Sequence, residues 1–294
     1  MKIATYNLCF LYGEGMHKHS GKDYMFSEDF VEERINYFVK EFTKVNADIL
    51  FVQELGSEEV LKKIIQKMEE NYEYFIAEPD VNGVGNAVLY KINNCKCESV
   101  PAKTSLPVFI DKDQDMLGSR MYSRRDFVHL STMYNNKIIH FLGIHIKSNF
   151  LVPEQSVNGV AKPMISQTEV AEGRIRSEFF RFSQAKKVRE LVDNFFIDSD
   201  LANVVVLGDF NSHVKNPVFK IIQGEVKDSP DYLIPITNDI SKDGLIDHIL
   251  VSKNIKEQVL SVEILNDYEF DSKSKDSFPY FIESDHPILM FSLK

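Results

Sequence analysis

The stretch Asn203–His213, which reads NVVVLGDFNSH, constrains the fold of this chain more than any other. Its four consecutive apolar residues, Val204–Leu207, are typical of a fully buried strand. Gly208 ends this run and allows the backbone to turn closely. Asp209 and Asn211 follow at a spacing of two, which in an extended chain places both side chains on one face. The pattern therefore indicates a buried strand that ends in a carboxylate and an amide.

A carboxylate beside an amide at a strand end suits metal-assisted chemistry on phosphate. The carboxylate can orient or deprotonate a water molecule, and the amide can donate to a phosphoryl oxygen. An Asp after a strand can also be structural, because Asp caps helices. The motif alone supports either interpretation of Asp209.

The same arrangement recurs along the chain, where further apolar segments carry Asn, Asp, Glu or His at one end. The residues at these ends are Asn7, Glu54, His145, Asp247 and the pair Asp285-His286. Each has an ordinary structural explanation of its own. Together they form the set that a hard-cation phosphoester site needs, namely carboxylates for the ion, amides, and two histidines for proton transfer.

These residues resemble, in identity and order, the motifs of the endonuclease/exonuclease/phosphatase superfamily, to which the DNase I-like nucleases belong. The matching elements are Asn7, Gln53-Glu54, Gly208-Asp209-Phe210-Asn211, Ile246-Asp247 and Ser284-Asp285-His286-Pro287. The match therefore covers nearly the whole chain. The segment His145-Ile146-Lys147-Ser148 is similar to an element of DNase I-like and bacterial members. Abasic-site endonucleases carry a Tyr in that region, so the resemblance disfavours their branch.

The resemblance implies a bound divalent cation, Mg²⁺ or Mn²⁺. Glu54 is the first expected ligand, and Asn7 and Asp285 are expected to complete the shell directly or through water. Mg²⁺ prefers an octahedron of oxygens and usually keeps several waters, so one or two carboxylates are enough.

The resemblance also implies catalytic roles. Asp209 would orient or activate the attacking water, and Asn211 would bind the phosphate. His286 would act as a general base or as a charge stabiliser, while Asp247 holds its tautomer and raises its pKa. His145 is the candidate acid for the leaving oxygen.

Three further residues are candidates for substrate binding. They are Arg125, Asn86 and Lys147; Arg124 is an equally near rival of Arg125, and a turn is the alternative role for Asn86. His140 is expected in the core, because its odd separation from His145 points the two side chains to opposite faces of a strand. The remaining histidines considered, His17, His19, His213 and His248, are expected to be non-catalytic.

Apolar periodicity predicts three helices: from a Ser27 cap to about Asn46, after a Ser57 cap, and from about Ser177 to Phe196. The predicted strands are Lys2–Tyr6, Ile49–Gln53, Glu73–Ala77, Asn86–Lys91, Lys96–Val100, Asp126–Tyr134, Lys137–His145, Val204–Leu207, Leu245–Ser252, Val259–Leu265 and Ile288–Leu293. Tyr134–Lys137 is read as a hairpin turn. Many strands with helices between them indicate two packed sheets with helices outside. The resemblance implies the same α/β fold, a four-layer αββα sandwich.

Three stretches lack periodicity and are expected to be loops, of which the second could roof the site. They are Asp111–Ser123, Asn149–Glu172 and Gly224–Gly244. We find no Gly/Ser/Pro-rich linker, so a single domain over residues 1–294 is expected.

The net charge of −10 bears on the substrate, because non-specific DNA binding depends mainly on Lys and Arg that neutralise phosphates. A basic cluster could still form from Arg120, Arg124, Arg125, Lys147, Arg174 and Arg176. Composition therefore favours a small phosphoester mildly and does not exclude nucleic acid.

No apolar run reaches the ~20 residues of a membrane helix, and the N-terminus does not resemble a signal peptide. The three cysteines, Cys9, Cys95 and Cys97, favour neither a disulfide scaffold nor a zinc site. A reducing cytoplasm, no membrane anchor and a monomer are the default expectations.

The leading hypothesis is a metal-dependent phosphodiesterase, in the first place a nuclease acting on DNA. The alternative is a phosphatase or phosphodiesterase of a small or lipid-derived phosphoester, such as an inositol phosphate or a phospholipid head group. A catalytically dead interaction module is disfavoured, because none of the motif positions is lost.

Overall fold

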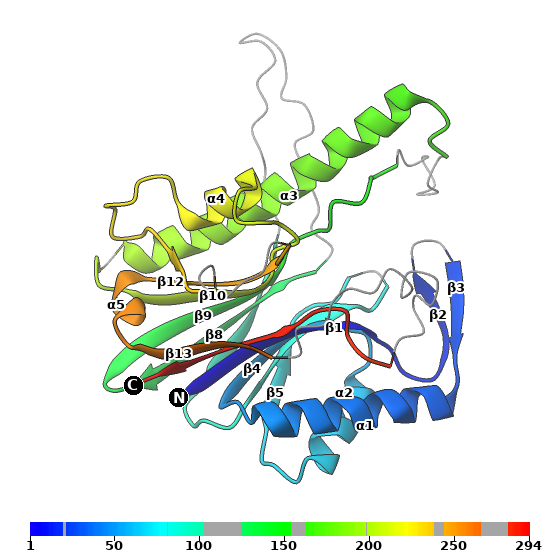
Figure 1. Cartoon of the computed structure of the whole chain (residues 1–294), viewed down its shortest axis with the longest axis horizontal. Helices are drawn as coiled ribbons and strands as arrows, with labels where there is room; N and C mark the ends of the chain where they lie inside the picture. Colours follow the sequence, from blue (N-terminus) through cyan, green and yellow to red (C-terminus); the bar gives the residue numbers. More distant parts are fainter. Residues whose placement is uncertain are drawn as a thin grey trace.

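Two six-stranded sheets form the centre of the protein (Figure 1). The computed structural model describes residues 1–19, 22–80, 82–102, 125–153, 163–197, 199–237, 244–265 and 282–294. The first sheet has the order β13, β14, β1, β4, β6 and β5, with the bounds Val259–Leu265, Ile288–Leu293, Lys2–Leu11, Ile49–Leu55, Gly85–Tyr90 and Glu73–Ile76. The second has the order β11, β12, β10, β9, β8 and β7, with the bounds Ile234–Pro235, Asp247–Val251, Asn203–Asp209, Lys137–His145, Phe127–Tyr134 and Lys96–Val100.

Helices cover the outer face of each sheet (Figure 1). Helices α1 (Glu28–Val45) and α2 (Glu58–Lys67) pack on the first sheet. Helices α3 (Gln167–Phe196) and α4 (Pro217–Gln223) pack on the second. The single turn of α5 (Lys253–Lys256) lies between β12 and β13 in the sequence. The arrangement is the four-layer αββα sandwich that the resemblance implied.

The two sheets approach each other closely in the central apolar layer, which contains Phe51 of β4 and Phe141 of β9. At Gly143 of β9, an added Cβ would lie 2.2 Å from the Phe51 ring. Only glycine therefore allows this approach of one sheet to the other. Because the layer is this tight, the strand ends of both sheets lie next to one another at its edge.

The first two predicted helices are confirmed, with their caps. Ser27 caps α1 by accepting from the Phe30 amide, and Asn46 ends it in a left-handed conformation. Ser57 caps α2 in the same way. These boundaries could be predicted because caps are local signals.

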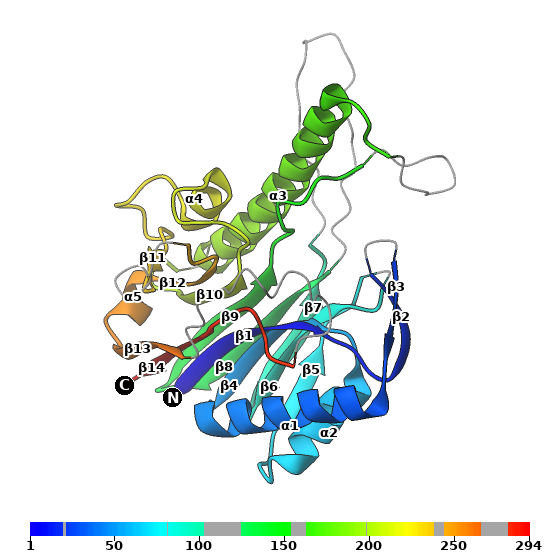
Figure 2. The same ribbon diagram turned by 45° about the vertical axis from the view of Figure 1, so that its right-hand side comes forward.

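The prediction for the third helix was wrong at its N-terminus. Helix α3 begins at Gln167, ten residues before the expected start at Ser177, and Ser166 forms a capping box with Glu169. Its first turns bury little, since Ile175 is 56% exposed, and they project past the sheets (Figure 2). The apolar stripe that signals a helix is therefore absent there. The predicted loop Asn149–Glu172 is shorter than expected for the same reason.

Short elements were also missed. They are the hairpin of β2 (Gly15–His19) and β3 (Lys22–Phe26), the helices α4 and α5, and strand β11. The hairpin strands pair with neither central sheet. They form a separate two-stranded sheet (Figure 2). Elements this short carry too few residues for a periodic pattern. The predicted loop Asp111–Ser123, together with Arg120 and Arg124, lies outside the described residues.

Strand pairing places the polar strand ends together. Strand β1 runs parallel to β4, and β9 runs parallel to β10, so the carboxyl ends of each pair lie at the same edge of their sheet. In the second sheet, Asp209 is in register with both His145 and Asp247. Within the described ranges, no helix combines the length and apolar character that crossing a bilayer requires.

Candidate active site

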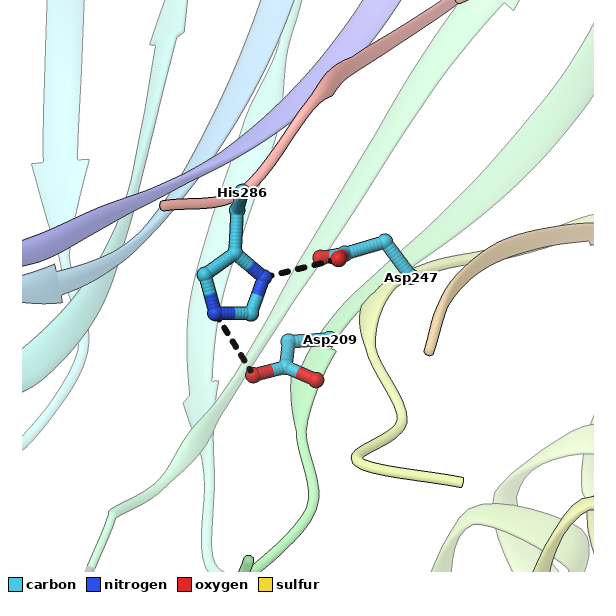
Figure 3. Close-up of side chains that lie close together, drawn as sticks. All are labelled: Asp209, Asp247 and His286. Atoms are coloured by element: carbon cyan, nitrogen blue, oxygen red, sulfur yellow. Dashed lines mark hydrogen bonds and ion pairs between the residues drawn. The ribbon is translucent and has the colours of Figure 1, made fainter. Parts of the chain in front are cut away.

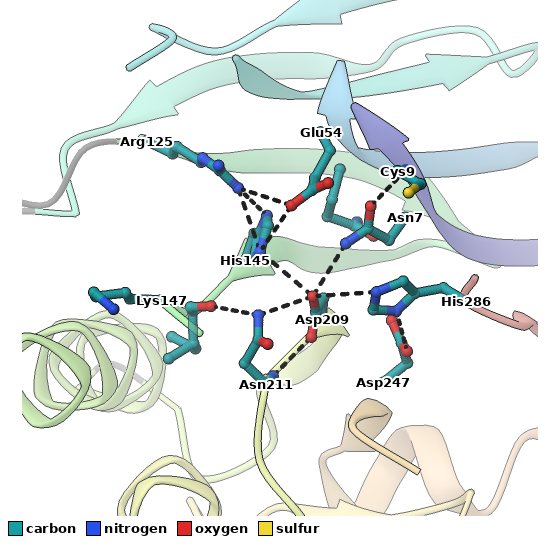
Figure 4. A network of polar contacts seen from close by, with 12 residues as sticks. Asn7, Cys9, Glu54, Arg125, His145, Lys147, Asp209, Asn211, Asp247 and His286 are labelled. Atoms are coloured by element: carbon teal, nitrogen blue, oxygen red, sulfur yellow. Dashed lines mark hydrogen bonds and ion pairs between the residues drawn. The ribbon is translucent and has the colours of Figure 1, made fainter. Parts of the chain in front are cut away.

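Polar side chains from the two sheets meet at one point between the layers (Figure 4). Asn7 and Glu54 come from β1 and β4 of the first sheet, and His145 and Asp209 come from β9 and β10 of the second. Each of the four is at most 8% exposed. Such a concentration of buried polar groups is costly unless they are paired or bind a ligand.

Two further predicted residues complete the cluster. Asp247 lies opposite Asp209 at the start of β12. His286 stands just before β14 in a segment that Ser284 attaches to β1, because the Ser284 hydroxyl donates to the Asn7 carbonyl at 2.5 Å. The His286 amide in turn donates to the Ser284 hydroxyl at 3.1 Å. The imidazole is therefore held by the first sheet and faces the second.

Asp247 and Asp209 flank the two nitrogens of His286 (Figure 3). Nδ1 lies 2.7 Å from Oδ2 of Asp247, and Nε2 lies 4.0 Å from Oδ2 of Asp209. Burial lowers the pKa of His286, but the charges of Asp247, Asp209 and Asp285 outweigh it and raise the pKa well above 6.5. The expected role of Asp247, to orient His286 and raise its pKa, matches this geometry.

Asp209 is the centre of the hydrogen-bond network. Its Oδ2 accepts from the side-chain amides of Asn7 at 3.1 Å and Asn211 at 2.9 Å, and it lies 3.4 Å from Nε2 of His145. Burial and the neighbouring Asp247 nevertheless raise the pKa of Asp209 to about 7. A carboxylate with a pKa near neutrality can accept a proton from a water molecule more readily than an exposed one.

Asn211 lies beside Asp209, but not in the expected extended chain. Strand β10 ends at Asp209, and Asn211 has a φ of 47°. The Asn211 amide donates to Oδ1 of Asp209 at 2.7 Å, so the two side chains meet across a tight turn. Strand β10 continues through Gly208, contrary to expectation, and there glycine allows the close approach to β9, since its φ is +133° and an added Cβ would lie 2.1 Å from the Ile144 carbonyl oxygen.

Glu54, in β4 of the first sheet, has a strained backbone conformation and lies across the site from Asp209. Its φ is 60°, which is rare for a residue with a side chain. Its Oε2 accepts from the Phe10 amide at 3.1 Å, and its Oε1 lies 3.3 Å from Nη1 of Arg125. Burial raises the pKa of Glu54, although Arg125 opposes this. The carboxylate is thus held in place but only partly neutralised.

Arg125 determines the tautomer of His145. Its Nη1 lies 2.8 Å from Nδ1 of His145, and because a guanidinium can only donate, Nδ1 must be the acceptor. The imidazole proton then sits on Nε2, which faces Asp209. Burial and the charges of Arg125 and His286 lower the pKa of His145 well below 6.5, so the ring is neutral.

The donor set fits a hard divalent cation. Four carboxylates, Glu54, Asp209, Asp247 and Asp285, interact electrostatically in one small region. Burial raises the pKa of both Glu54 and Asp209, so a bound cation would stabilise their ionised forms. Oxygen ligands with excess negative charge are what Mg²⁺ and Mn²⁺ select.

The geometry distinguishes two halves of this donor set. Asp209, Asp247 and His286 offer ligand atoms within 4.8 Å of one another, but Nδ1 of His286 is already engaged by Asp247 at 2.7 Å. Glu54 has no such imidazole partner at hydrogen-bond distance, since its nearest approach to His145 is 3.8 Å. The expectation that Glu54 is the first cation ligand stays a prediction. Asn7 can contribute only the remaining lone pair of Oδ1, which accepts from the Cys9 amide at 2.9 Å.

Two predicted substrate-binding residues contact the protein itself. Asn86 is buried and donates to the Asp126 carbonyl at 2.7 Å, next to Arg125. Lys147 directs its ammonium to the carbonyls of Ser148 and Phe150, away from the cluster (Figure 4). Lys147 therefore stabilises its own loop in this structure.

The basic residues of α3 act on the same loop. Arg174 donates to the Asn149 carbonyl and Arg176 to the Val152 carbonyl, both at 2.8 Å. Of the expected basic cluster, the described members therefore bind backbone or the acidic site. Lys147, Arg174 and Arg176 all donate to carbonyls of residues 148–152, so these three cations lie along one short segment.

The sequence reasoning missed Asp80, which supports Arg125. Its Oδ2 accepts from Nε of Arg125 at 3.3 Å, and its Oδ1 accepts from the amides of Asn82 and Val84. The signal was the Asp80-x-Asn82-Gly83 turn, in which Asp bonds to its own backbone two residues later. That pattern identifies a turn but not its distant partner.

Two of the histidines expected to be non-catalytic or in the core pack against aromatic rings, although His140 is only half-buried. His140 faces α3 and stacks on Phe195, opposite to the face of His145. His248 is 1% exposed between Phe210 and Phe219, and its Nε2 contacts the Ser212 carbonyl at 2.8 Å. The three cysteines are free thiols.

One family of known proteins matches nearly the whole chain. The sequence profile described as "Endonuclease/Exonuclease/phosphatase family" matches residues 4–286. The comparison with curated protein sequences gave no match.

Solved structures share the fold over the full length of the chain. The human Nocturnin catalytic domain is 15% identical, with a TM-score of 0.59 and coverage of 100% of this chain and 94% of that one. A humanized D. rerio TDP2 is 12% identical, with a TM-score of 0.58 and coverage of 99% and 98%. A mannosyl-6-phosphatase from Bacteroides thetaiotaomicron is 15% identical, with a TM-score of 0.58 and coverage of 100% and 99%. The chain belongs to the endonuclease/exonuclease/phosphatase family and is a metal-dependent phosphoric ester hydrolase.

Proposed function

We propose that this hydrolase is a phosphodiesterase that acts on nucleic acid, in the first place DNA. The observation that carries the proposal is the convergence on Asp209 of Asn7, Asn211 and two imidazoles, with Glu54 on the facing wall. A buried carboxylate with a pKa of about 7 is suited to orient a water molecule and accept its proton. The surrounding amides and imidazoles supply donors for the phosphate oxygens.

The cation would be held by Glu54, with Asn7 and Asp285 contributing directly or through water. When bound, it neutralises charge on the phosphate and on the leaving oxygen. The buried contacts of Glu54 with Phe10 and Arg125 fix the orientation of its carboxylate. A pre-oriented ligand needs no rearrangement when the cation binds.

His286 is best suited to the role of charge stabiliser. Its pKa lies well above 6.5 among three carboxylates, so the imidazolium is the favoured form. An imidazolium facing Asp209 can donate to a phosphate oxygen and offset the charge that develops there. It could act as a general base only after losing this proton.

His145 is assigned a different role from the acid expected from the sequence. Its ring is neutral, because burial and Arg125 disfavour the second proton. A neutral ring with its proton on Nε2 can donate a hydrogen bond to a phosphate oxygen. Asn211 would do the same after exchanging one of its bonds to Asp209 or Ile146.

Two groups of observations bear on the substrate. The His145-Ile146-Lys147-Ser148 element and the similarity in fold to a D. rerio TDP2 crystallised with a single-strand DNA product favour nucleic acid. The net charge of −10 and the similarity in fold to a mannosyl-6-phosphatase, with a TM-score of 0.58 against 0.55 for that TDP2 structure, favour a small phosphoester. A phosphatase or small-molecule phosphodiesterase is therefore the second candidate.

The deciding experiment compares substrates under one set of conditions. Plasmid DNA, single-stranded DNA, RNA, bis-p-nitrophenyl phosphate and p-nitrophenyl phosphate are each incubated with Mg²⁺ or Mn²⁺, with Asp209→Asn as the inactive control. We expect DNA and the diester to be cleaved and the monoester to be spared. Cleavage of the monoester alone would replace the nuclease proposal with the phosphatase.

A further inference from the structure

Arg34 is a buried arginine on the apolar face of α1. It is 1% exposed and stands between Val31 and Phe38, which both pack in the core. Its guanidinium donates to three consecutive carbonyls of β1: Leu8 at 2.6 Å, Cys9 at 3.1 Å and Phe10 at 2.8 Å. Burying this charge is costly, so its bonds to the backbone must offset a large desolvation penalty.

The same peptide groups bind the predicted cation ligands on their other side. The group that joins Leu8 to Cys9 offers its carbonyl to Arg34 and its N–H to Oδ1 of Asn7 at 2.9 Å. The next group offers the Cys9 carbonyl to Arg34 and the Phe10 N–H to Oε2 of Glu54 at 3.1 Å. The carbonyl and N–H of a trans peptide point in opposite directions. Each peptide therefore links Arg34 to one ligand.

Cys9 and Phe10 of β1 have a strained backbone conformation that requires support from neighbouring groups. Cys9 and Phe10 have φ values of 49° and 55°, and the ladder between β1 and β4 is interrupted between Asn7 and Leu11. A positive φ at a residue other than glycine costs roughly 1–3 kcal/mol and persists only where the surroundings enforce it. Among the described residues, Arg34 is the side chain that binds all three carbonyls.

We propose that Arg34 is a positioning residue for the divalent cation, acting on Asn7 and Glu54 through these two peptide groups. A guanidinium bound to a carbonyl polarises the peptide and strengthens the donor at its N–H end. The carboxylate of Glu54 is thereby oriented before a cation arrives. The inference rests on the proposed function, in which Glu54 and Asn7 hold the cation.

Arg181 of α3 offers a matched control from the opposite layer. It is 2% exposed, and its Nη2 donates to the Asn211 carbonyl at 3.0 Å and to the Ser212 hydroxyl at 2.5 Å. Arg181 therefore supports Asn211, a residue with positive φ in the second sheet's half of the site, as Arg34 supports Cys9 and Phe10 in the first. It makes no contact with the peptides that hold Asn7 and Glu54.

The experiment measures Mg²⁺ affinity by calorimetry in the unaltered protein, Arg34→Lys and Arg181→Lys. Lysine keeps the charge but cannot bind three carbonyls in a planar fork. We expect both variants to melt at lower temperature and to keep their circular dichroism spectrum. Only Arg34→Lys should weaken Mg²⁺ binding, by at least tenfold. Equal affinity in a folded Arg34→Lys variant, or an equal loss in both variants, would overturn the proposal.

A spectroscopic measurement on the unaltered protein covers the case in which Arg34→Lys does not fold. Saturating Mg²⁺ should shift the NMR signals of the Arg34 guanidinium and of the Cys9 and Phe10 amides, while the Arg181 guanidinium signal stays in place. Unchanged Arg34 and Phe10 signals at saturation would refute the role of Arg34 alone. If the unaltered protein binds neither Mg²⁺ nor Mn²⁺ and cleaves no phosphoester, the proposed function fails, and the role of Arg34 with it.

Discussion

His286 and Asp247 join the two halves of the active site through a contact of 2.7 Å between Nδ1 and Oδ2, although they lie 39 residues apart. Asp247 begins β12 of the second sheet, whereas His286 precedes β14 of the first. The relative position of the sheets therefore sets the charge state of the imidazole.

Replacing Asp247 should change the titration of His286. In Asp247→Asn the largest of the three charges that raise the pKa of His286 is lost, so that pKa should fall. We expect turnover to fall roughly a hundredfold or more, because a positioned proton-transfer or charge-stabilising group contributes on that scale. NMR titration of the metal-free protein follows the imidazole directly. Asp228→Asn, on the exposed surface, is the control; an unmoved His286 titration in Asp247→Asn would contradict the assignment.

Replacing Glu54 should separate stability from metal binding. Burial raises the pKa of Glu54, so its ionised form is unfavourable in the metal-free fold. Glu54→Gln should therefore unfold at no lower urea concentration than the unaltered metal-free protein, yet bind Mg²⁺ at least tenfold more weakly. Glu58→Gln, four residues later on the exposed end of α2, should leave Mg²⁺ affinity unchanged. Unchanged Mg²⁺ binding in Glu54→Gln would show that the cation is held elsewhere.

Asp209 and His286 should act on one transition state. They flank a gap of 4.0 Å between Nε2 and Oδ2, where a reacting group can contact both. We expect Asp209→Asn and His286→Ala each to reduce the rate by roughly three orders of magnitude, and the double variant to fall little further. Rates of all three variants on a small chromogenic diester test this. Fully multiplicative losses would mean that the two residues serve separate steps.

His248 should make the protein sensitive to acid. Burial lowers the pKa of His248 to about 4, so the folded state takes up the proton at a lower pH than the unfolded state does. Its contribution to the free energy of unfolding is full above pH ~6.5, and it is lost progressively as the pH falls to ~4, by roughly 3 kcal/mol. His248→Gln, which keeps a donor for the Ser212 carbonyl, should flatten this dependence. Urea unfolding between pH 7 and 4.5 measures it, and parallel curves for the two proteins would refute the prediction.

Local patterns were enough for much of the fold. The caps at Ser27 and Ser57 and the turn at Asn135-Asn136 were predicted correctly, because each depends on residues within one turn. The start of α3 was not, since a helix that projects from the core has no apolar stripe. The length of an element is thus predictable only where it is buried.

The residues that form the site were predictable, but their protonation states and hydrogen-bond partners were not. Asn7, Glu54, His145, Asp209, Asp247 and His286 were all expected at strand ends, and they meet. The neutral state of His145 was not predictable, because it depends on Arg125 and on burial by distant strands. The direction of the Lys147 side chain was not predictable either. Its ammonium donates to the carbonyls of Ser148 and Phe150 in its own loop.

The sequence by itself determined which polar residues stand at the ends of buried strands, because an apolar run and its boundaries can be recognised within a few consecutive residues. Only the tertiary structure decided how those residues are held. Arg34 looks like an interruption of an apolar helix face, yet it binds the backbone beside Glu54 from a separate layer. Protonation, hydrogen-bond direction and support depend on which atoms approach within a few ångströms. That proximity arises from the pairing and packing of strands far apart in the chain.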